Sequence, residues 1–475
     1  MKSKRIVRTC VAILALYMPA AQAQTQQAQG TGPIAPVGPI RQGTGSNAQR
    51  QMPTPAARGL NLEPGAMDAP QVRADTHTLS SIETLGIGSL AVVSSIIDPS
   101  FVFGQLGDTG ITPGSKSISS SLGVNLSFDR NTSRSSLTGF YGGAQVLYHP
   151  DSSYNAVYHK LAVSQEIRWA RWVLRLRDDL LISPEASFGG LDMGGLGLSG
   201  GNNLNSLQPS AGASETILTQ RAKRLSNTAS GEVNYSLSRR SIVTFAGSYA
   251  SLHFMDPGYI DSRRITGRVG YDYALAPKDS IALFYDYRRT DFSPTSDRLQ
   301  TDSFQLSYGR KVTGRLALQI AAGPLLLHSS LQDRTLDWTL SGAMTYQTRR
   351  SHYSLSYARG PSSGSGVFLG ADSHTVTASM RNALTQSWSS SLSAGYAFDQ
   401  NLAPVNGVVS HFSNWYGSAG LGREFGRHVR FDLTYRFQQQ GAGTGTCPVL
   451  ACGSTQARQT LGVVLAWHPW SITAR

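Results

Sequence analysis

Residues 118–128 read ISSSLGVNLSF and alternate between two kinds of side chain. The even positions are apolar or small and end in Val124, Leu126 and Phe128, while the odd positions are serine, glycine or asparagine. A period of two is that of a β-strand, so the stretch predicts a strand with one apolar and one polar face. In a soluble sandwich the apolar face would pack on a core, whereas in a membrane barrel it would face lipid.

The same alternation recurs between about residue 97 and residue 468. Aliphatic and aromatic side chains take alternate positions in stretches near 225–237, 265–273, 336–346, 388–398, 429–437 and 461–467. No stripe with the 3.6-residue period of an amphipathic helix competes with this pattern. The apolar run at 85–97 is too short for a helix to cross a bilayer, which takes about 20 residues. The pattern therefore predicts an all-β chain.

The connections between these stretches alternate in length. Short turns are expected near 129–134, 167–170, 238–241, 276–279, 311–314, 347–351, 383–387 and 425–428. Mostly longer stretches separate them, at 184–222, 255–262, 290–300, 359–371, 399–412 and 440–458. Outer-membrane barrels have this asymmetry, and a sandwich has no reason for it. We therefore predict that lipid contacts the apolar positions of the first stretch, namely Ile118, Leu122, Val124, Leu126 and Phe128.

The strand count supports a closed barrel. Seventeen strands are expected between 116 and 468, and one more at 96–106 would bring both chain ends to the same side of the membrane. The total of about eighteen, with sixteen to eighteen compatible with the pattern, is even, as in single-chain outer-membrane barrels. Tyrosine and tryptophan near many strand ends fit the aromatic girdles of such barrels, although cross-strand pairs in a soluble sheet would look similar. We predict a transmembrane antiparallel up-and-down β-barrel.

Residues 1–23 have the three regions of a secretory signal peptide. Four basic residues between Lys2 and Arg8 precede an apolar core at 10–18, and residues 21–23 (AQA) fit a cleavage site. Without this leader the formal net charge falls from +13 to 13 − 4 = +9. An exported protein rarely meets nucleic acid, so we expect the charge to serve contact with anionic headgroups, anionic solutes or solubility.

The mature chain divides into two parts by composition. Residues 24–80 are rich in Gln, Gly, Pro and Ala and show no period, so we expect a disordered periplasmic segment. The barrel is expected to take residues 81–475.

At the level of pattern, residues 97–470 resemble bacterial outer-membrane β-barrel proteins of the porin-like kind. The chain also resembles uncharacterised barrel proteins with a Gly-rich loop, here 184–222, and a late CxxxxC loop, here Cys447 and Cys452. The resemblance implies a bacterial outer-membrane location, contact with outer-membrane lipid, insertion by the barrel-assembly machinery and passage of small solutes. One departure is the C-terminus, because such barrels usually end on an aromatic residue and here SITAR follows Trp470.

We find no persuasive catalytic constellation in the sequence. Outer-membrane proteases and lipases use Asp/His or Ser/His pairs at the rim, and His253, His328 and His411 have no such partner fixed nearby in sequence. The stretch 189–203 (GGLDMGGLGLSGGNN) opens no helix and lacks the lysine of a phosphate-binding loop. We interpret it as a loop over the mouth of the barrel or folded into it, and we expect no enzymatic activity, cofactor or metal.

Charged residues fall on the polar side of the alternation. Inward placement is favoured, because a charge facing lipid at the midplane costs about 2–4 kcal/mol. Arginines outnumber acids in this set, which predicts a lumen that concentrates anions unless many are paired within the wall, as Arg268 would be opposite Asp286. The predicted pore-lining residues are Arg175, Arg177, Arg264, Arg268, Asp286, Arg288, Arg381, Arg430, Asp432 and Arg436.

Asp178 does not fit this placement. Alternation from Leu176 points its side chain at lipid, and a β-bulge near Arg177 would be needed to turn it inward.

Cys447 and Cys452 remain once Cys10 leaves with the leader. In an exported protein such a pair is most simply a disulfide that closes a small loop. A metal or redox site is the alternative, but no histidine or acid lies nearby to complete one.

Three functions fit these features. The first is a porin-like barrel for passive passage of small solutes, including anionic ones. The second is a surface adhesion or structural barrel plugged by the Gly-rich loop, and the third is the outer-membrane conduit of a polysaccharide export system. Conductance separates the first from the second, and the sequence leaves the oligomeric state open.

Overall fold

The computed structural model describes residues 94–109, 117–183, 222–402, 410–442, 456–469 and 472–474, apart from residues 133, 150, 151, 153, 154, 239, 331, 349, 364, 365, 386 and 427. The predicted signal peptide, the 24–80 segment, most of the Gly-rich loop and the cysteine pair Cys447 and Cys452 lie outside the described residues. Among the residues described, no helix is long and apolar enough to span a membrane.

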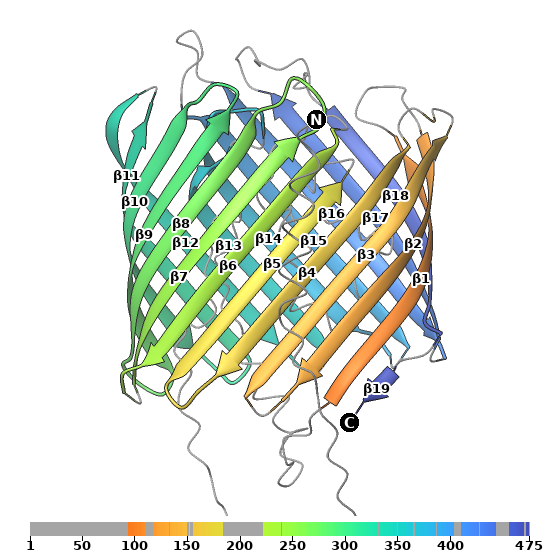
Figure 1. Cartoon of the computed structure of the whole chain (residues 1–475), viewed down its shortest axis with the longest axis horizontal. Coiled ribbons are helices and arrows are strands. Elements are labelled where there is room, and N and C mark those ends of the chain that lie inside the picture. The colour runs from red at the N-terminus through yellow and green to blue at the C-terminus, as the bar shows by residue number, and fades with distance from the viewer. Residues whose placement is uncertain are drawn as a thin grey trace, which may run out of the picture. The chain divides into compact units, whose positions relative to one another are not determined.

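Eighteen long strands and one short one make up the described chain (Figure 1). Their bounds are β1 Ser94–Asp108, β2 Ser117–Asn131, β3 Ser135–His149, β4 Ala156–Arg168, β5 Trp172–Ser183, β6 Arg224–Ser236, β7 Ser241–Phe254, β8 Asp261–Ala274, β9 Asp279–Ser293, β10 Arg298–Lys311, β11 Leu316–Ser329, β12 Gln332–Gln347, β13 Ser351–Ser362, β14 Ala371–Ala383, β15 Trp388–Asn401, β16 His411–Phe425, β17 Val429–Ala442, β18 Gln456–Trp467 and β19 Ile472–Ala474.

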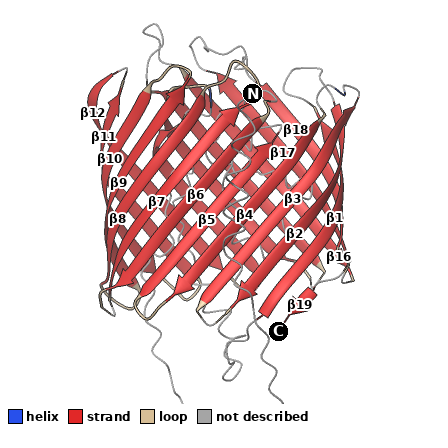
Figure 2. Ribbon diagram, in the orientation of Figure 1, coloured by secondary structure: helices blue, strands red, loops and turns tan. Residues whose placement is uncertain are grey.

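From β1 to β18 each strand pairs antiparallel with the next, and β1 pairs with β18 from Phe101↔Trp467 to Asp108↔Thr460. The sheet therefore closes into a barrel, as predicted, and β1 and β18 leave no free long edge (Figure 2). The strand predicted at 96–106 is confirmed as β1. Just beyond the last long strand, β19 pairs with the start of β1, so part of the SITAR sequence extends the wall.

The connections alternate as the sequence predicts. Three or four residues join the strands at one end of the barrel, as at 132–134 and 426–428, and this is called the short-turn end below. Most connections at the other end are longer, and this is called the mouth. The exceptions at the mouth are the four-residue connection 294–297 between β9 and β10 and the two-residue connection 330–331 between β11 and β12.

Burial follows the two-residue period and identifies the outer face. Ile118, Leu122, Val124 and Leu126 are exposed, with Leu122 at 69%, while Ser119 and Ser121 between them are buried. The same holds around the wall, where the large apolar side chains are exposed on the outside and small polar ones are buried inside. In water such an exterior would be unfavourable, whereas a band of apolar side chains around a closed barrel is what lipid requires.

Candidate functional site

The structure places all ten residues of the predicted pore-lining set on the inner face of the wall. On each strand their immediate neighbours are the outward residues, such as Leu176 beside Arg175 and Arg177, or Leu433 beside Asp432. Arg381 lies opposite Ser391, and Arg436 lies opposite Thr460. The inner face therefore carries a charged wall, and its chemistry depends on how these charges are paired.

Arg175 is held between two acids. Its Nε donates to Glu166 Oε2 over 2.8 Å, and its Nη1 donates to Glu232 Oε1 over 2.7 Å. The three residues occupy one row of the ladder across β4, β5 and β6, which brings them together without any bend of the chain. On the same strand, Arg177 Nε donates to Asp179 Oδ2 over 2.7 Å. Both arginines are thus largely neutralised within the wall.

The predicted contact between Arg268 and Asp286 is present. The two residues are paired across β8 and β9, and Arg268 Nη2 donates to Asp286 Oδ2 over 2.9 Å. Gln305 of β10 donates to the same carboxylate oxygen over 3.1 Å. The Arg268 side chain is only 2% exposed, so this pair forms a fixed part of the wall.

Three of the remaining inward arginines differ in the kind of group that they contact. Arg430 Nε donates to Asp432 Oδ2 over 2.9 Å at the short-turn end. Arg264 Nε donates to Thr290 Oγ1 over 3.3 Å, and Arg288 Nη1 donates to the carbonyl oxygen of Pro361 over 3.1 Å.

The structure adds inward-facing acids that the sequence analysis did not place. They are Asp108, Glu166, Asp179, Glu232, Asp272 and Asp399, and the added bases are Lys160, Arg224 and Arg458. Arg458 of β18 donates through Nε to Asp108 Oδ2 of β1 over 3.0 Å, so an ion pair also crosses the closing seam. The excess of positive charge on the inner face is therefore smaller than the sequence pattern predicts.

Asp178 lies on the outer face, as strict alternation predicts. The register of β5 with β4 and β6 runs without a shift past Arg177, so the suggested bulge is wrong. The carboxylate accepts a hydrogen bond of 3.0 Å from Asn227 Nδ2, on the outer face of β6. This neighbouring amide provides the polar contact that lipid does not.

His253 does have an acidic partner, which its sequence neighbours did not reveal. Its Nδ1 lies 2.5 Å from Asp261 Oδ2, and the other oxygen of that carboxylate accepts the backbone N–H of Phe254 over 2.8 Å. Asp261 therefore holds the β7–β8 connection together, and the pair lies on the outer face at the mouth.

An apolar segment of the β13–β14 connection, residues 366–370, folds into the mouth. Val367 and Phe368 are 1% and 3% exposed, and the Phe368 and Phe412 rings lie 5.4 Å apart. Leu369 packs on a cluster of inward residues from β9, β10 and β11. We call residues 366–370 the mouth segment; the sequence analysis treated them as part of an ordinary outer loop.

Backbone contacts tie the mouth segment to distant parts of the wall. The N–H of Ile260, before β8, donates to Gly366 O over 3.0 Å, and the N–H of Leu402, after β15, donates to Gly370 O over 3.2 Å. Gly366 has φ +78°, and a Cβ there would lie 2.4 Å from the Phe254 ring. Only glycine fits this approach, so the segment narrows the mouth by a specific docking.

Tyr259 borders this docking. Its ring stacks on Phe254 with centroids 4.8 Å apart. Burial is the main reason that the pKa of Tyr259 is raised, so its hydroxyl is neutral at physiological pH.

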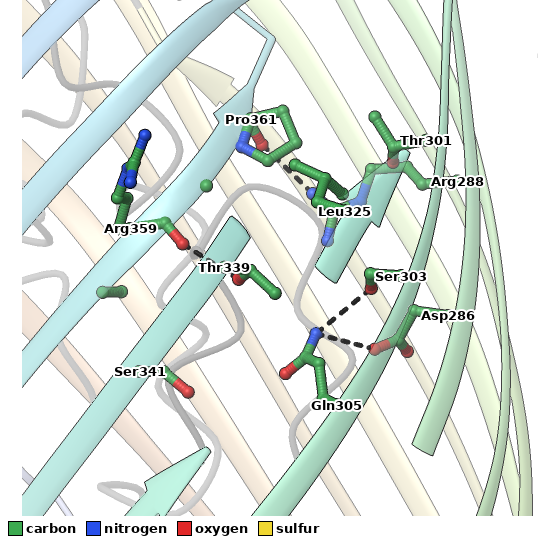
Figure 3. Close-up of a pocket in the computed structure, with 12 residues that line it drawn as sticks. Asp286, Arg288, Thr301, Ser303, Gln305, Leu325, Thr339, Ser341, Arg359 and Pro361 are labelled. Atoms are coloured by element: carbon green, nitrogen blue, oxygen red, sulfur yellow. Dashed lines mark hydrogen bonds between the residues drawn. The ribbon is translucent and has the colours of Figure 1, made fainter. Parts of the chain in front are cut away.

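Below the mouth, a pocket of about 440 Å³, measured to include its open side, lies against the inner wall of β9–β13 (Figure 3). Its lining is mainly polar and includes Asp286, Arg288, Ser303, Gln305 and Ser341. In Figure 3, Gln305 points toward Ser303 and Asp286, and the Thr339 hydroxyl is bonded to Arg359. Hydroxyl, amide and guanidinium groups thus converge on one part of the lumen.

No protein-family model and no curated protein matches the chain. Solved structures resemble it weakly. Pseudomonas aeruginosa OccK2 (OpdF) is 10% identical over 79% of this chain and 98% of its own, with a TM-score of 0.41. P. aeruginosa OpdK with vanillate is 9% identical over 80% and 99%, with a TM-score of 0.40. Acinetobacter baumannii OccAB1 is 8% identical over 79% and 97%, with a TM-score of 0.41.

Such TM-scores do not assign the chain to a family, but its own topology places it in a class. Only helices and closed barrels satisfy every backbone hydrogen bond in lipid. An apolar outer face and a charged inner face then distinguish a membrane barrel from a soluble one. With eighteen long antiparallel strands closed between β1 and β18, the chain is a β-barrel of the bacterial outer-membrane type.

Proposed function

We propose that the protein is a porin-like barrel that allows small solutes, anionic ones included, to cross the outer membrane passively. The observation that carries this proposal is the inner wall, where charged and hydroxyl side chains run from the short-turn end to the mouth. Eighteen strands make a barrel wide enough for an aqueous path, as in porins of sixteen to eighteen strands. The mouth segment would then set the narrowest part of that path.

Conductance tests this proposal directly. The mature chain, refolded and inserted in planar bilayers, should conduct ions. Gly366→Ala should raise the conductance, because the new methyl group cannot fit against Phe254 and releases the mouth segment. Gly314→Ala is the matched control, since a Cβ at Gly314 meets nothing within 4 Å. Failure of both variants and of the unmodified chain to conduct would overturn the proposal.

Selectivity tests the role of the inward arginines. Arg381→Gln and Arg436→Gln remove positive charge from the inner face and should move the reversal potential in a salt gradient toward cation preference. The shift should shrink at high salt through screening. Arg423→Gln is the control, because Arg423 lies on the outer face, 5.0 Å above the Trp388 ring. An equal shift in the control would mean that the inner arginines do not line the ion path.

A structural or adhesion barrel is the second candidate, and the packed mouth segment favours it. If the unmodified chain is silent and Gly366→Ala conducts, the mouth segment closes the barrel and the surface role is preferred. Silence that ends on deletion of residues 189–203 would instead identify the Gly-rich loop as the plug.

The route to the membrane is part of the proposal. We infer that residues 1–23 direct export, that the barrel-assembly machinery inserts the barrel, and that the short-turn end faces the periplasm. We further infer that Cys447 and Cys452 form a disulfide, and that the protein has no enzymatic activity. N-terminal sequencing of protein purified from outer membranes should find Gln24 first, and Met1 at that position would contradict the leader.

A further inference from the structure

Eight turns close the hairpins at the short-turn end, and they share one position. In each turn, the carbonyl of the residue just before the next strand accepts a backbone hydrogen bond of 2.7–2.9 Å from the strand beside it, as Arg240 O does from Ala274 N–H. The shared position holds His428 in one turn, Ser387 in another and a permanent cation in the other six. We call these six cations the basic ring: Arg134, Arg171, Arg240, Lys278, Arg315 and Arg350.

The basic ring lies on the lumen side of the rim. Each of its residues continues the ladder by one step and lies opposite an inner-face residue, as Arg240 lies opposite the buried Ala274. The residues that follow them, such as Trp172, belong to the outer face. All six side chains are exposed, and none makes an ion pair or a side-chain hydrogen bond within the described part of the chain. The ring is therefore a set of solvated positive charges around the opening of the lumen.

The acidic side chains at this end are held by other groups. Arg175 binds Glu166, Arg310 lies 3.7 Å from Asp279, and Arg430 binds Asp432 and lies 3.9 Å from Glu424. Asn131 donates to Asp129, and His468 lies 3.5 Å from Asp98. The eight residues opposite the shared position are all described, and only Glu424 among them is acidic. It lies opposite Ser387, at the turn where a basic residue is missing, so the rest of the rim keeps an excess of positive charge.

The dimensions of the ring determine what it can attract. Strands ~4.8 Å apart and tilted by ~40° place neighbouring ring residues ~12 Å apart and ~18 Å from the axis of an eighteen-strand barrel. The Debye length is ~8 Å at physiological ionic strength, so the ring is screened from a small ion on the axis. Lipid headgroups lie outside the wall, whereas the ring lies on its lumen side. The ring therefore favours a soluble polyanion that extends along the rim and carries many charges.

Hydroxyl groups line the wall further into the lumen. One inner-face row, with each residue opposite the next across β12–β16, consists of Thr345, Ser354, Ser379, Ser393 and Ser418. Ser354 Oγ lies 2.6 Å from Ser379 Oγ, and the four serines are half-buried. On β13 this hydroxyl row lies four residues beyond Arg350, or ~10 Å along the axis. Because a hydroxyl both donates and accepts, the row suits a ligand that is itself rich in hydroxyl groups.

Two chemistries thus follow each other from the rim into the lumen. A chain that fits both the basic ring and the hydroxyl row carries carboxylates and hydroxyl groups along its length. We propose that the short-turn end binds an acidic polysaccharide, whose carboxylates lie on the basic ring and whose sugar hydroxyls reach the hydroxyl row. An acidic polypeptide would also meet the ring, but its Asp and Glu side chains offer no hydroxyl group to the row. The proposal rests on the inferred periplasmic orientation of this end, and binding at the ring needs no ion current.

Binding of fluorescent polygalacturonate to the barrel, held in nanodiscs of zwitterionic lipid, tests the ring. Arg240→Gln, Lys278→Gln and Arg315→Gln together remove three neighbouring charges and should weaken binding about a hundredfold, at roughly fivefold per charge. Arg240→Lys with Arg315→Lys keeps the charge and should keep the affinity. Binding to the unmodified chain should weaken as salt rises, because salt screens the ring. An affinity that the triple glutamine variant leaves unchanged would refute the role of the ring.

The matched control removes the same charge from the mouth. Lys223→Gln, Arg263→Gln and Arg334→Gln also replace three exposed bases that have no ion pair among the described residues. Binding should stay within about twofold of the unmodified chain, because the mouth lies several Debye lengths from the ring. An equal loss in the control would mean that net charge, and not the ring, attracts the chain. Both triple variants should conduct ions as the unmodified chain does, which separates loss of chain binding from loss of the pore.

A comparison of probes tests the chemical class of the ligand. Poly-L-glutamate of equal charge should bind about tenfold more weakly than polygalacturonate, because it cannot bond to the hydroxyl row. Ser354→Ala, Ser379→Ala, Ser393→Ala and Ser418→Ala together should remove this difference and leave poly-L-glutamate binding unchanged. The control is Ser119→Ala, Ser121→Ala, Ser303→Ala and Ser307→Ala, at buried inner-face serines of β2 and β10, and it should keep the difference. Equal binding of the two polyanions to the unmodified chain would overturn the polysaccharide and identify the ring as a docking site for an acidic protein.

Discussion

Replacing Asp178 with leucine should stabilise the barrel, although most substitutions in a folded protein destabilise it. Asp178 faces outward between Val163 and Ala229, its partners in the neighbouring strands. It lies six residues above Trp172, whose ring is part of the outer aromatic band at the short-turn end. At ~3.3 Å per residue and a tilt of ~40°, that is ~15 Å along the membrane normal, near the middle of an apolar band ~25 Å tall.

The expected gain follows from what lipid contacts. A basic residue at the midplane of a barrel exterior costs about 2–4 kcal/mol, and an acidic one costs less. Part of the cost is already offset by the 3.0 Å hydrogen bond from Asn227. Asn227 Nδ2 also lies 3.4 Å from the backbone oxygen of Asp179, so it keeps one acceptor when the carboxylate is removed. We therefore expect Asp178→Leu to gain about 1 kcal/mol.

The assay is reversible urea unfolding of the barrel in lipid vesicles, followed by tryptophan fluorescence. Asp179→Leu, one residue along the chain, is the control. Asp179 is buried on the inner face and binds Arg177, so its replacement removes this ion pair within the wall and should destabilise the barrel. A loss of stability in Asp178→Leu as large as that in the control would refute lipid exposure of Asp178. A protein partner covering that face would then be the better explanation.

Three further predictions follow from the inner wall and the loops. Asp286→Asn should lower the free energy of unfolding by about 3–5 kcal/mol, because the buried Arg268 would lose its ion pair with the Asp286 carboxylate; equal urea midpoints would contradict this. Gly323→Ala should prevent the heat-modifiable gel migration of a folded barrel, since the new Cβ would lie 1.7 Å from the carbonyl oxygen of Phe304, whereas Gly267→Ala, with nothing within 4 Å, should fold. The Cys447–Cys452 pair should be unreactive to thiol reagents without reduction, and its double serine variant should assemble normally, because a short loop loses little entropy on closure. Free thiols in protein from the outer membrane would refute that pairing.

The fold was predictable because its determinant is local. The two-residue period needs only neighbouring residues to be read, and closure of an apolar-outside sheet follows from the solvent. The same alternation placed Asp178 on the outer face correctly. The suggestion of a bulge was wrong because Asn227 had not been recognised as the polar partner of Asp178 there. Alternation states which face a residue takes but not what lies opposite it.

Predicting the ion pairs of the lumen requires the register of neighbouring strands in addition to the alternation along each strand. Arg268 and Asp286 could be matched because a tight turn joins their strands. Arg175 binds Glu166 and Glu232, and the second of these lies beyond the long 184–223 connection, whose length hides the register. The acids were visible in the sequence, but their neighbours were not.

The mouth segment was missed for a different reason. Its apolar triplet, Val367 to Leu369, stands between Gly366 and Gly370 in a stretch that the alternation pattern leaves as a loop. Three consecutive large apolar residues in a loop that should be solvated indicate burial, and the flanking glycines permit the positive φ values that the docking uses. This signal was present and could have been used.

Two Gly–Pro pairs coincide with gaps in the strand pairing beside the pocket. Gly323–Pro324 interrupts the pairing of β10 with β11, which lapses between Ser303↔Leu325 and Leu306↔Ala322, and Gly360–Pro361 ends the pairing of β12 with β13. Ser303, Gln305 and Leu325 at the first break, and Arg359 to Pro361 at the second, line the same pocket. A barrel needs continuous ladders wherever lipid contacts its backbone, because lipid offers no hydrogen bonds. Two interruptions therefore meet at one cavity, where side chains replace the missing backbone partners, as Thr339 Oγ1 does when it donates to the carbonyl oxygen of Arg359 over 2.9 Å.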